Sequence, residues 1–196
     1  MRTSLRIACV LAITFLLTGC GGSSFEPSVS SLYIQKDGSI TEAIVESFAQ
    51  EYYSFDEFED MVEKEIEAYN QGFAEEQVSI QSLELKNSAI YLLLDYPDAE
   101  AYSAYNEVYC FQGTIEEALA EGLNFDMLFR DADYEDYDTV EVTAKSSNQV
   151  LVLRDECVVQ TESAIKYVSN NVEILDSHMA EVMPIDDEEE YAYIIY

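Results

Sequence analysis

An acidic segment, DADYEDYD at residues 131–138, places carboxylates at alternating positions. Asp131, Asp133 and Glu135 are spaced as in the first half of a calcium-binding loop, and calcium prefers such oxygen ligands. The segment departs from an EF-hand, because Asp136 stands where glycine is required and Val142 where glutamate is required. The spacing therefore predicts a weak calcium site at most. The alternative is a solvated acidic loop whose two tyrosines pack back onto a sheet.

Two cysteines, Cys110 and Cys157, could form a disulfide if the chain is exported, because oxidising compartments permit it. Each also fits as a small buried apolar side chain, so the sequence leaves both roles open. His178 is the single histidine of the chain, and no cysteine–histidine spacing typical of a metal site surrounds it. Because Asp176 and Ser177 precede it, we expect His178 to lie in a turn.

The sequence contains none of the short catalytic motifs that carry a recognisable mechanism: no nucleophile elbow, His-Glu-x-x-His pair, phosphate-binding loop or dinucleotide fingerprint. Carboxylate pairs of the kind that glycosidases use carry no specificity in a chain with 40 acidic residues. Tryptophan, which often stacks on sugars, is absent. We therefore expect a non-enzymatic protein without a cofactor, and an enzyme of unrecognised type is a less favoured alternative.

Tyrosines are numerous, at 15, and several of them could line a binding surface, because tyrosine is favoured at protein interfaces. The alternative, which we favour, is that they surround a core with the ring buried and the hydroxyl in water. The tyrosines in question are Tyr52, Tyr53, Tyr102, Tyr105 and Tyr109.

The first 20 residues have the pattern of an export signal. Arg2 and Arg6 precede an apolar run over residues 7–17, in which Thr14 is the one polar residue. This run is too short for a helix that crosses a hydrocarbon core, which needs roughly 20 residues. Its length suits the hydrophobic segment of a signal peptide, and the alternative is a buried helix with a chance cysteine.

The run ends in LTGC at residues 17–20, which resembles the lipobox of bacterial lipoproteins. The resemblance implies that the thiol of Cys20 receives a diacylglyceryl group and that residues 1–19 are removed. Two acyl chains hold a protein stably at a membrane, whereas one chain binds marginally. We expect residues 20–30 to be a lipidated cysteine and a flexible tether on the extracytoplasmic face of the cell membrane. A single acidic domain would follow over residues 31–196.

The charge excludes several classes of partner. The chain carries 40 acidic and 9 basic residues, for a formal charge of −31. Removal of residues 1–19, which hold two of the basic residues and none of the acidic ones, makes the charge −33. Nucleic acids and anionic polymers are bound through basic patches, so we expect neither as a partner. The expected partners are the membrane, through Cys20, and an unknown protein or peptide.

The pattern of elements predicts an α+β fold, an antiparallel sheet system with two or three covering helices. One hairpin is expected across Asp37-Gly38 within residues 31–48, and another turning near Lys86 within residues 77–96. Helices are expected over residues 54–72, where Ser54 and Glu57 form a capping-box pattern, and over 97–108 and 114–122. The stretch 89–94 predicts a strand covered on both faces. Further strands are expected over 124–129, 139–144, 149–153, 157–161, 164–168 and 172–175, and over 191–196 as an edge strand.

Several stretches also resemble small surface lipoproteins of Gram-positive anaerobes. They are LYIQKDGSITEAIVESF from Leu32, EIEAYN from Glu65, YNEVYCFQGTIEEALAEG from Tyr105, IKYVSNNVEI from Ile165 and AYIIY from Ala192. The resemblance implies a surface lipoprotein with one compact domain, and it implies no catalytic residue. We therefore expect a membrane-anchored binding or assembly module. The alternative is a cation-dependent ligand-binding protein that uses residues 131–138.

Overall fold

A computed structural model describes residues 25–50, 52–184 and 190–196. Over these residues the fold is α+β, with thirteen strands in two mostly antiparallel sheets and four helices. The predicted fold class is confirmed, although the helices number four instead of two or three. The signal peptide and lipobox predicted over residues 1–20 lie outside the described residues.

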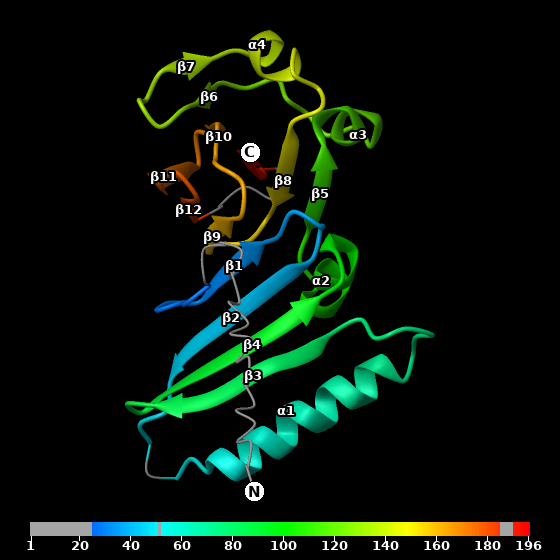
Figure 1. Cartoon of the computed structure of the whole chain (residues 1–196), viewed down its shortest axis with the longest axis vertical. Coiled ribbons are helices and arrows are strands. Elements are labelled where there is room, and N and C mark those ends of the chain that lie inside the picture. The colour runs from blue at the N-terminus through cyan, green and yellow to red at the C-terminus, as the bar shows by residue number, and fades with distance from the viewer. Residues whose placement is uncertain (1–24, 51, 185–189) are drawn as a thin grey trace, which may run out of the picture.

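The first sheet has seven strands in the order β11-β12-β9-β1-β2-β4-β3 (Figure 1). Its pairs are antiparallel except for β1 and β9, which run parallel. Both predicted hairpins are confirmed, and Gly38 turns the first of them with a φ of +96°, which glycine adopts without strain. The strands are β1 (Ser31–Ile34), β2 (Ile40–Ser47), β3 (Ser79–Lys86), β4 (Ala89–Tyr96), β9 (Val158–Thr161), β11 (Val172–Asp176) and β12 (Met179–Val182).

The second sheet has six strands in the order β5-β8-β13-β10-β6-β7. The C-terminal strand β13 lies between β8 and β10, so the prediction that it forms a sheet edge is wrong. All of its residues are buried, and an apolar strand covered on both faces belongs in the interior of a sheet. The strands are β5 (Cys110–Thr114), β6 (Phe129–Arg130), β7 (Asp136–Tyr137), β8 (Gln149–Leu153), β10 (Tyr167–Ser169) and β13 (Ala192–Ile195).

The three predicted helices are present as α1 (Phe55–Asn70), α2 (Ala99–Asn106) and α3 (Ile115–Ala120). Their predicted N-terminal caps are present. In α1, Ser54 Oγ accepts a hydrogen bond from the backbone N–H of Glu57 at 3.3 Å. The complete capping box of α3 is formed by Thr114 and Glu117.

Residues 139–144, predicted as a strand, form the helix α4 (Thr139–Thr143) instead. Its β-branched residues favour a strand, but Asp138 and Glu141 form a reciprocal capping box that satisfies the first backbone donors of a helix. The strand predicted over 124–129 is reduced to the two residues of β6, because the segment before it turns beneath the sheet with Phe125 buried.

Two apolar clusters hold the elements together. The larger joins the two sheets with α1 and α2, and it includes Leu32 and Leu94 from the first sheet and Leu151 and Ile194 from the second. The smaller cluster lies on the other face of the second sheet and includes Ile115 of α3 and Val142 of α4. The second sheet is therefore covered on both faces, and Figure 1 shows α3 and α4 at the end of the molecule opposite α1.

Strand β4 was expected to be covered on both faces, but it alternates between fully and partly buried residues. Its inner face carries Ile90, Leu92 and Leu94, which pack with Val62 and Ile66 of α1 in the larger cluster. The expectation is therefore right for one face only. None of the described helices is both long and apolar enough to cross a membrane.

Part of the segment predicted as a flexible tether contacts the first sheet. The ring of Phe25 stacks on the ring of Tyr33 in β1, with centroids 5.2 Å apart. The hydroxyl of Ser30 also accepts a hydrogen bond from the backbone N–H of Val45 at 3.0 Å. Among the described residues, the chain is therefore already attached to the sheet at Phe25.

Candidate functional site

The acidic segment 131–138 forms the turn between β6 and β7 and the cap of α4. Asp131 Oδ1 accepts hydrogen bonds from the backbone of Asp133 at 2.9 Å and of Glu135 at 3.1 Å, and its Oδ2 accepts one from the Tyr137 hydroxyl at 2.9 Å. Desolvation acts to raise the pKa of Asp131, but these hydrogen bonds outweigh it and lower that pKa. Asp131 thus stabilises the turn itself with both of its oxygens.

The turn does not gather the predicted calcium ligands into a site. Across residues 25–50, 52–184 and 190–196, no group of three or more His, Cys, Asp and Glu side chains is placed to hold a metal ion. Calcium binding by Asp131, Asp133 and Glu135 stays a prediction from the sequence.

Cys110 and Cys157 are both free thiols that pack in the larger cluster. Burial, with a smaller contribution from the Asp155 carboxylate, raises the pKa of Cys110 to about 12. Burial also raises the pKa of Cys157, and Asp155 and Cys110 add to that effect. In this state both cysteines act as small apolar side chains, and the disulfide stays a prediction.

His178 lies in the turn between β11 and β12, as predicted. Its backbone N–H donates a hydrogen bond to Asp176 Oδ1 at 2.7 Å, and its ring Nδ1 lies 3.1 Å from the hydroxyl of Ser177. These contacts are local to the turn, and they give the imidazole a structural position.

A polar cluster that was not predicted from the sequence lies inside the larger core, and we call it the polar joint. Glu42 of β2 points to the core face, where its Oε2 accepts hydrogen bonds from the Tyr96 hydroxyl at 2.7 Å and from Asn106 Nδ2 at 3.4 Å. The Tyr102 hydroxyl donates to Asp155 Oδ2 at 3.2 Å. The joint therefore links the first sheet, α2 and the connection between β8 and β9.

The electrostatics of the polar joint favour protonated groups. Burial raises the pKa of Glu42 against the opposing effect of its hydrogen bonds, and the Asp155 carboxylate raises it further. Burial and the nearby Glu42 charge also raise the pKa of Tyr96 and of Tyr102, so both phenols remain donors. Both hydrogen-bond donors to Glu42 Oε2 are side chains of the fold itself, so we interpret the polar joint as a structural contact between the first sheet and α2. One sequence pattern is consistent with the burial of Glu42: side chains alternate along a strand, so Glu42 lies on the same face of β2 as Ile40 and Ile44.

The five tyrosines differ widely in exposure, and a role of any of them in binding stays a prediction. Tyr102 is a core residue with 1% exposure, and Tyr105 is partly buried against the rings of Tyr69 and Tyr96. Tyr52 and Tyr53 are 77% and 46% exposed. Tyr109, at 36%, borders a hollow beside the second sheet.

The exposed pair belongs to an apolar surface at the N-terminal end of α1, which we call the aromatic patch. It consists of Phe48, Tyr52, Tyr53, Phe58 and Met61, which line a hollow of about 430 Å³. The rings form a chain, with centroids 4.8 Å apart for Tyr52 and Tyr53, 4.8 Å for Tyr53 and Phe48, and 5.7 Å for Phe48 and Phe58. Phe48 and Phe58 pack on the larger core, so the patch is fixed to the fold.

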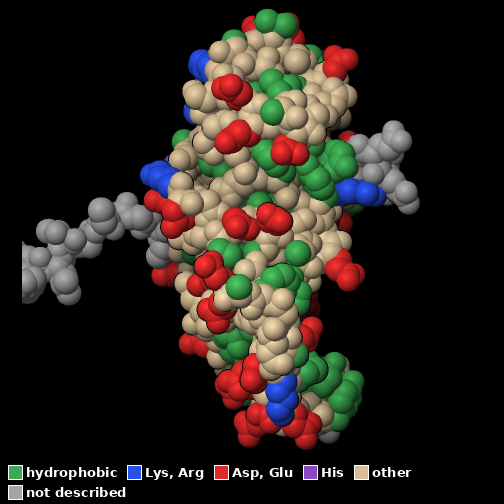
Figure 2. All heavy atoms as spheres, turned by 90° about the vertical axis from the view of Figure 1, so that its right-hand side faces the viewer, with side chains coloured by type: hydrophobic (Ala, Val, Ile, Leu, Met, Phe, Trp, Pro, Cys, Tyr) green, Lys and Arg blue, Asp and Glu red, His purple; other side chains and the backbone are tan. Residues whose placement is uncertain are grey.

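Acidic side chains surround the aromatic patch. Glu57 lines the hollow, and Asp56 shares the first turn of α1 with it. The nearby Lys64 forms an ion pair with Asp60 at 3.2 Å, so it does not offset the charges of the first turn. Figure 2 faces the other, C-terminal end of α1, and there too acidic side chains spread along the molecule and gather at the lower end. Exposed aromatic side chains inside an acidic surface favour contact with a basic, apolar partner.

Comparison of the chain with protein-family models, with curated proteins and with solved structures gives no match. The resemblance to lipoproteins stays a prediction, and the residues and their geometry are the basis for the function proposed below.

Proposed function

We propose that this chain is a lipid-anchored, extracytoplasmic binding module that is not an enzyme. Its aromatic patch would dock a protein segment that combines positive charge with large apolar side chains. The observation that carries the proposal is the exposure of Tyr52 and Met61, at 77% and 54%, on a surface whose inner residues are fixed by the core. Monomeric proteins seldom leave such contiguous apolar surface without a use.

The chemistry of the partner follows from the surroundings of the patch. A docked apolar side chain would gain by leaving water, at roughly 25 cal/mol for each Å² of buried apolar surface. Its neighbours would approach Asp56, Glu57 and the rest of an acidic surface, so basic neighbours would be attracted and acidic ones repelled. Aromatic residues and methionine are also the side chains that are enriched in protein interfaces.

The anchor supports the same function by holding the module at the membrane surface. The lipobox-like sequence at residues 17–20 would attach Cys20 to two acyl chains. Phe25, which packs on Tyr33, is the fifth residue after Cys20. Even a fully extended chain of that length reaches only about 17 Å, so the domain would be displayed close to the lipid.

A binding measurement with a defined peptide tests the docking proposal. The full-length chain, purified in a nonionic detergent, is titrated by calorimetry with a synthetic helical peptide of lysines and leucines. Two control peptides replace the lysines with glutamates or the leucines with serines. We expect binding of the first peptide only, and the affinity should fall as salt is added because charges contribute to it.

Matched variants locate the binding surface. Replacing Tyr52 and Met61 with serine should weaken binding of the lysine-leucine peptide about tenfold or more, since a few exposed anchors carry most of the energy of an interface. The control is Tyr134→Ser, because Tyr134 is 68% exposed but lies in the turn between β6 and β7. Equal loss in both proteins, or binding that survives the patch variant, would contradict the proposal.

A further inference from the structure

A second hollow, of about 540 Å³, opens where three segments of the chain meet beside the second sheet. Tyr109 immediately precedes β5, Tyr191 immediately precedes β13, and Glu121 immediately follows α3. Strands β5 and β13 flank β8 in the second sheet, so the two tyrosines meet across the end of β8. We call this hollow the tyrosine pocket.

The tyrosine pocket is lined by aromatic and apolar side chains together with polar ones. The rings of Tyr109 and Tyr191 have centroids 4.8 Å apart and planes at 60°, which is an edge-to-face arrangement. Leu123 and Met127 also line the hollow, and both pack on the smaller cluster. A volume of this size falls in the range of pockets that hold small molecules, which is roughly 300–1,000 Å³.

The charged groups of the pocket are carboxylates. Glu121 and Glu190 line it, and among the described lining residues there is no lysine or arginine. Burial raises the pKa of Tyr109, and the adjacent Tyr191 and Glu121 raise it further, which places the Glu121 carboxylate near that phenol. Tyr193, at the inner side of the pocket, has its pKa raised to about 12 by burial and by Tyr109 and Tyr191. At neutral pH the pocket therefore presents neutral aromatic rings together with negative charges.

We infer that the tyrosine pocket binds a small organic ammonium cation. The faces of Tyr109 and Tyr191 would attract the positive charge through their ring quadrupoles, as aromatic sites do for quaternary ammonium groups. Glu121 and Glu190 would compensate the charge, and Leu123 and Met127 would contact the methyl or methylene groups around it. This function goes beyond docking at the aromatic patch, because it uses a different surface and a different class of ligand.

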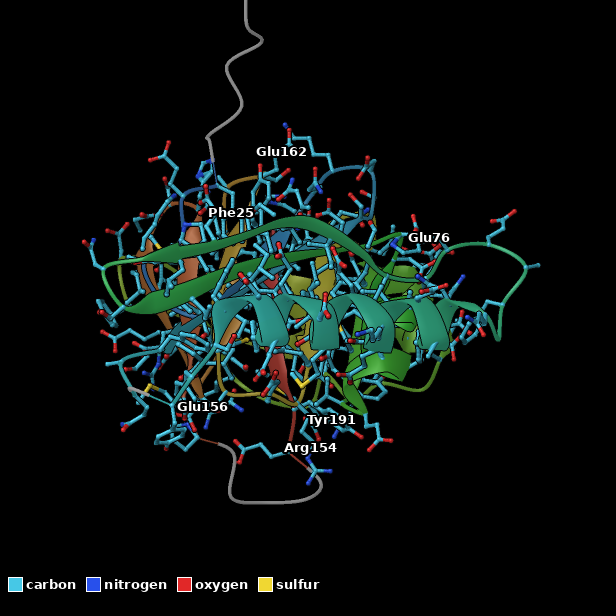
Figure 3. The ribbon with its side chains drawn as sticks, turned by 90° about the horizontal axis from the view of Figure 1, so that it is seen from below. Phe25, Glu76, Arg154, Glu156, Glu162 and Tyr191 are labelled. Carbon is cyan, nitrogen blue, oxygen red and sulfur yellow. The ribbon has the colours of Figure 1, made fainter. Side chains whose placement is uncertain are left out.

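Arg154 is a basic residue placed beside the pocket. Its backbone N–H donates a hydrogen bond to the carbonyl of Tyr109 at 3.0 Å, and Figure 3 shows Arg154 and Tyr191 on the same side of the molecule. Its charge opposes a bound cation and would favour a bound anion. The same figure shows Phe25 on the opposite side, so a short tether to the membrane would leave the pocket open.

Choline and a neutral molecule of the same shape test the inference. The full-length chain in a nonionic detergent is titrated with choline or with 3,3-dimethyl-1-butanol, and the aromatic proton resonances are followed by NMR. We expect choline to bind about tenfold more tightly than the alcohol, because a cation over aromatic rings gains energy that a neutral group does not. Binding that is equal for the two molecules, or no binding of choline in the millimolar range, would overturn the inference.

Three variants test whether choline binds in the tyrosine pocket and whether the pocket favours a positive charge. Tyr191→Leu should weaken choline binding about tenfold and Glu121→Gln about threefold, whereas Arg154→Gln should strengthen it about twofold. Tyr134→Leu, in the turn between β6 and β7, should leave it unchanged. Unchanged binding in Tyr191→Leu, or weaker binding in Arg154→Gln, would show that the pocket is not a cation site. Because these variants leave the aromatic patch intact, their failure would be separate from failure of the docking proposal.

Discussion

Glu42 is an acidic residue that the fold holds largely out of water. It lies on the core face of β2 with Tyr96 and Asn106 as its partners, and burial raises its pKa. The folded state therefore binds the Glu42 proton more tightly than the unfolded state does. The contribution of this group to stability is greatest at low pH, and it falls as pH rises from the unfolded pKa of about 4.3 through the folded pKa.

Glu42→Gln removes this titration while keeping an oxygen that can accept from Tyr96. We expect the stability of Glu42→Gln relative to the native chain to increase as pH rises above about 4.3 and to level off once pH exceeds the raised pKa of Glu42, as measured by urea unfolding at each pH. Glu46→Gln is the matched control, because Glu46 is on the same face of β2 but exposed. A stability difference that does not change with pH, or that declines as pH rises, would contradict the assigned burial of Glu42.

The two thiols of the larger core give a second prediction at the scale of residues. Thiolate is the reactive form of cysteine, and burial raises the pKa of Cys110 to about 12. At pH 8 the native chain should react with Ellman's reagent at least about a hundredfold more slowly than the unfolded chain.

The same assay separates free thiols from a disulfide. If residues 1–19 are removed and Cys20 is lipidated, as the lipobox-like sequence predicts, Cys110 and Cys157 are the remaining free cysteines, so two equivalents should react in urea without reductant. If none react until a reductant is added, the two cysteines are joined and the free-thiol state is wrong. Fast reaction of both thiols in the native state would contradict the burial of Cys110 and the partial burial of Cys157.

At the scale of elements, local sequence signals were enough to predict secondary structure where they act within one turn or one hairpin. Ser54, Thr114 and the Asp37-Gly38 pair act on backbone groups within three residues of themselves, and each of these predictions is confirmed. Residues 139–144 show how such signals compete. The β-branched residues favoured a strand there, but Asp138 and Glu141 form the cap of a helix.

The place of each strand in its sheet depends on pairing between distant segments, which local sequence patterns do not predict. Strand β13 lies between β8 and β10, whose residues are distant in sequence. The residues near Tyr193 therefore do not identify the strands that pair with β13. The tyrosine pocket has the same origin, because Tyr109, Glu121 and Tyr191 meet only when β5 and β13 flank β8. Tyr109 was singled out from the sequence, while its partners could not be.

Helix α1 is joined to the first sheet by one side chain at its C-terminal end. Asn70 Nδ2 donates to the carbonyl of Val78 at 2.7 Å, and its Oδ1 accepts from the backbone of Gln77 at 2.9 Å and of Val78 at 3.3 Å. Because Val78 is fully buried, Asn70→Ala should cost about 2–3 kcal/mol in urea unfolding by leaving buried backbone groups unpaired. Asn70→Asp should also be destabilising, because it keeps the Oδ1 acceptor of the two backbone N–H groups but replaces the Nδ2 donor with a carboxylate oxygen that faces the Val78 carbonyl. A loss in Asn70→Ala below about 0.5 kcal/mol would contradict this contact.

The turn between β6 and β7 gives the test of calcium binding. Asp131 already uses both oxygens within the turn, so a calcium ion would have to replace hydrogen bonds that stabilise it. We expect millimolar calcium to leave the melting temperature of the chain unchanged, with magnesium as the control for ionic strength. A rise of several degrees that is abolished by Asp133→Asn with Glu135→Gln would instead support the cation-dependent alternative.

At the scale of the whole molecule, the proposed lipid anchor would hold the acidic domain at the membrane surface. In a host that lipidates exported proteins, Cys20→Ala should release the chain from the membrane fraction or leave it unprocessed, because two acyl chains supply the attachment. Cys9→Ala is the matched control, since Cys9 lies within the segment that would be removed. If the Cys20→Ala chain remains processed and membrane-bound, the lipobox assignment is wrong.

Crosslinking on living cells measures docking at the aromatic patch most directly. A photoreactive phenylalanine derivative is placed at position 52 of the chain, and in a second strain at position 134, which is also highly exposed. We expect a discrete crosslinked partner from position 52 alone, with a basic, apolar segment at the point of attachment. No discrete adduct from position 52, or the same adduct from both positions, would contradict it.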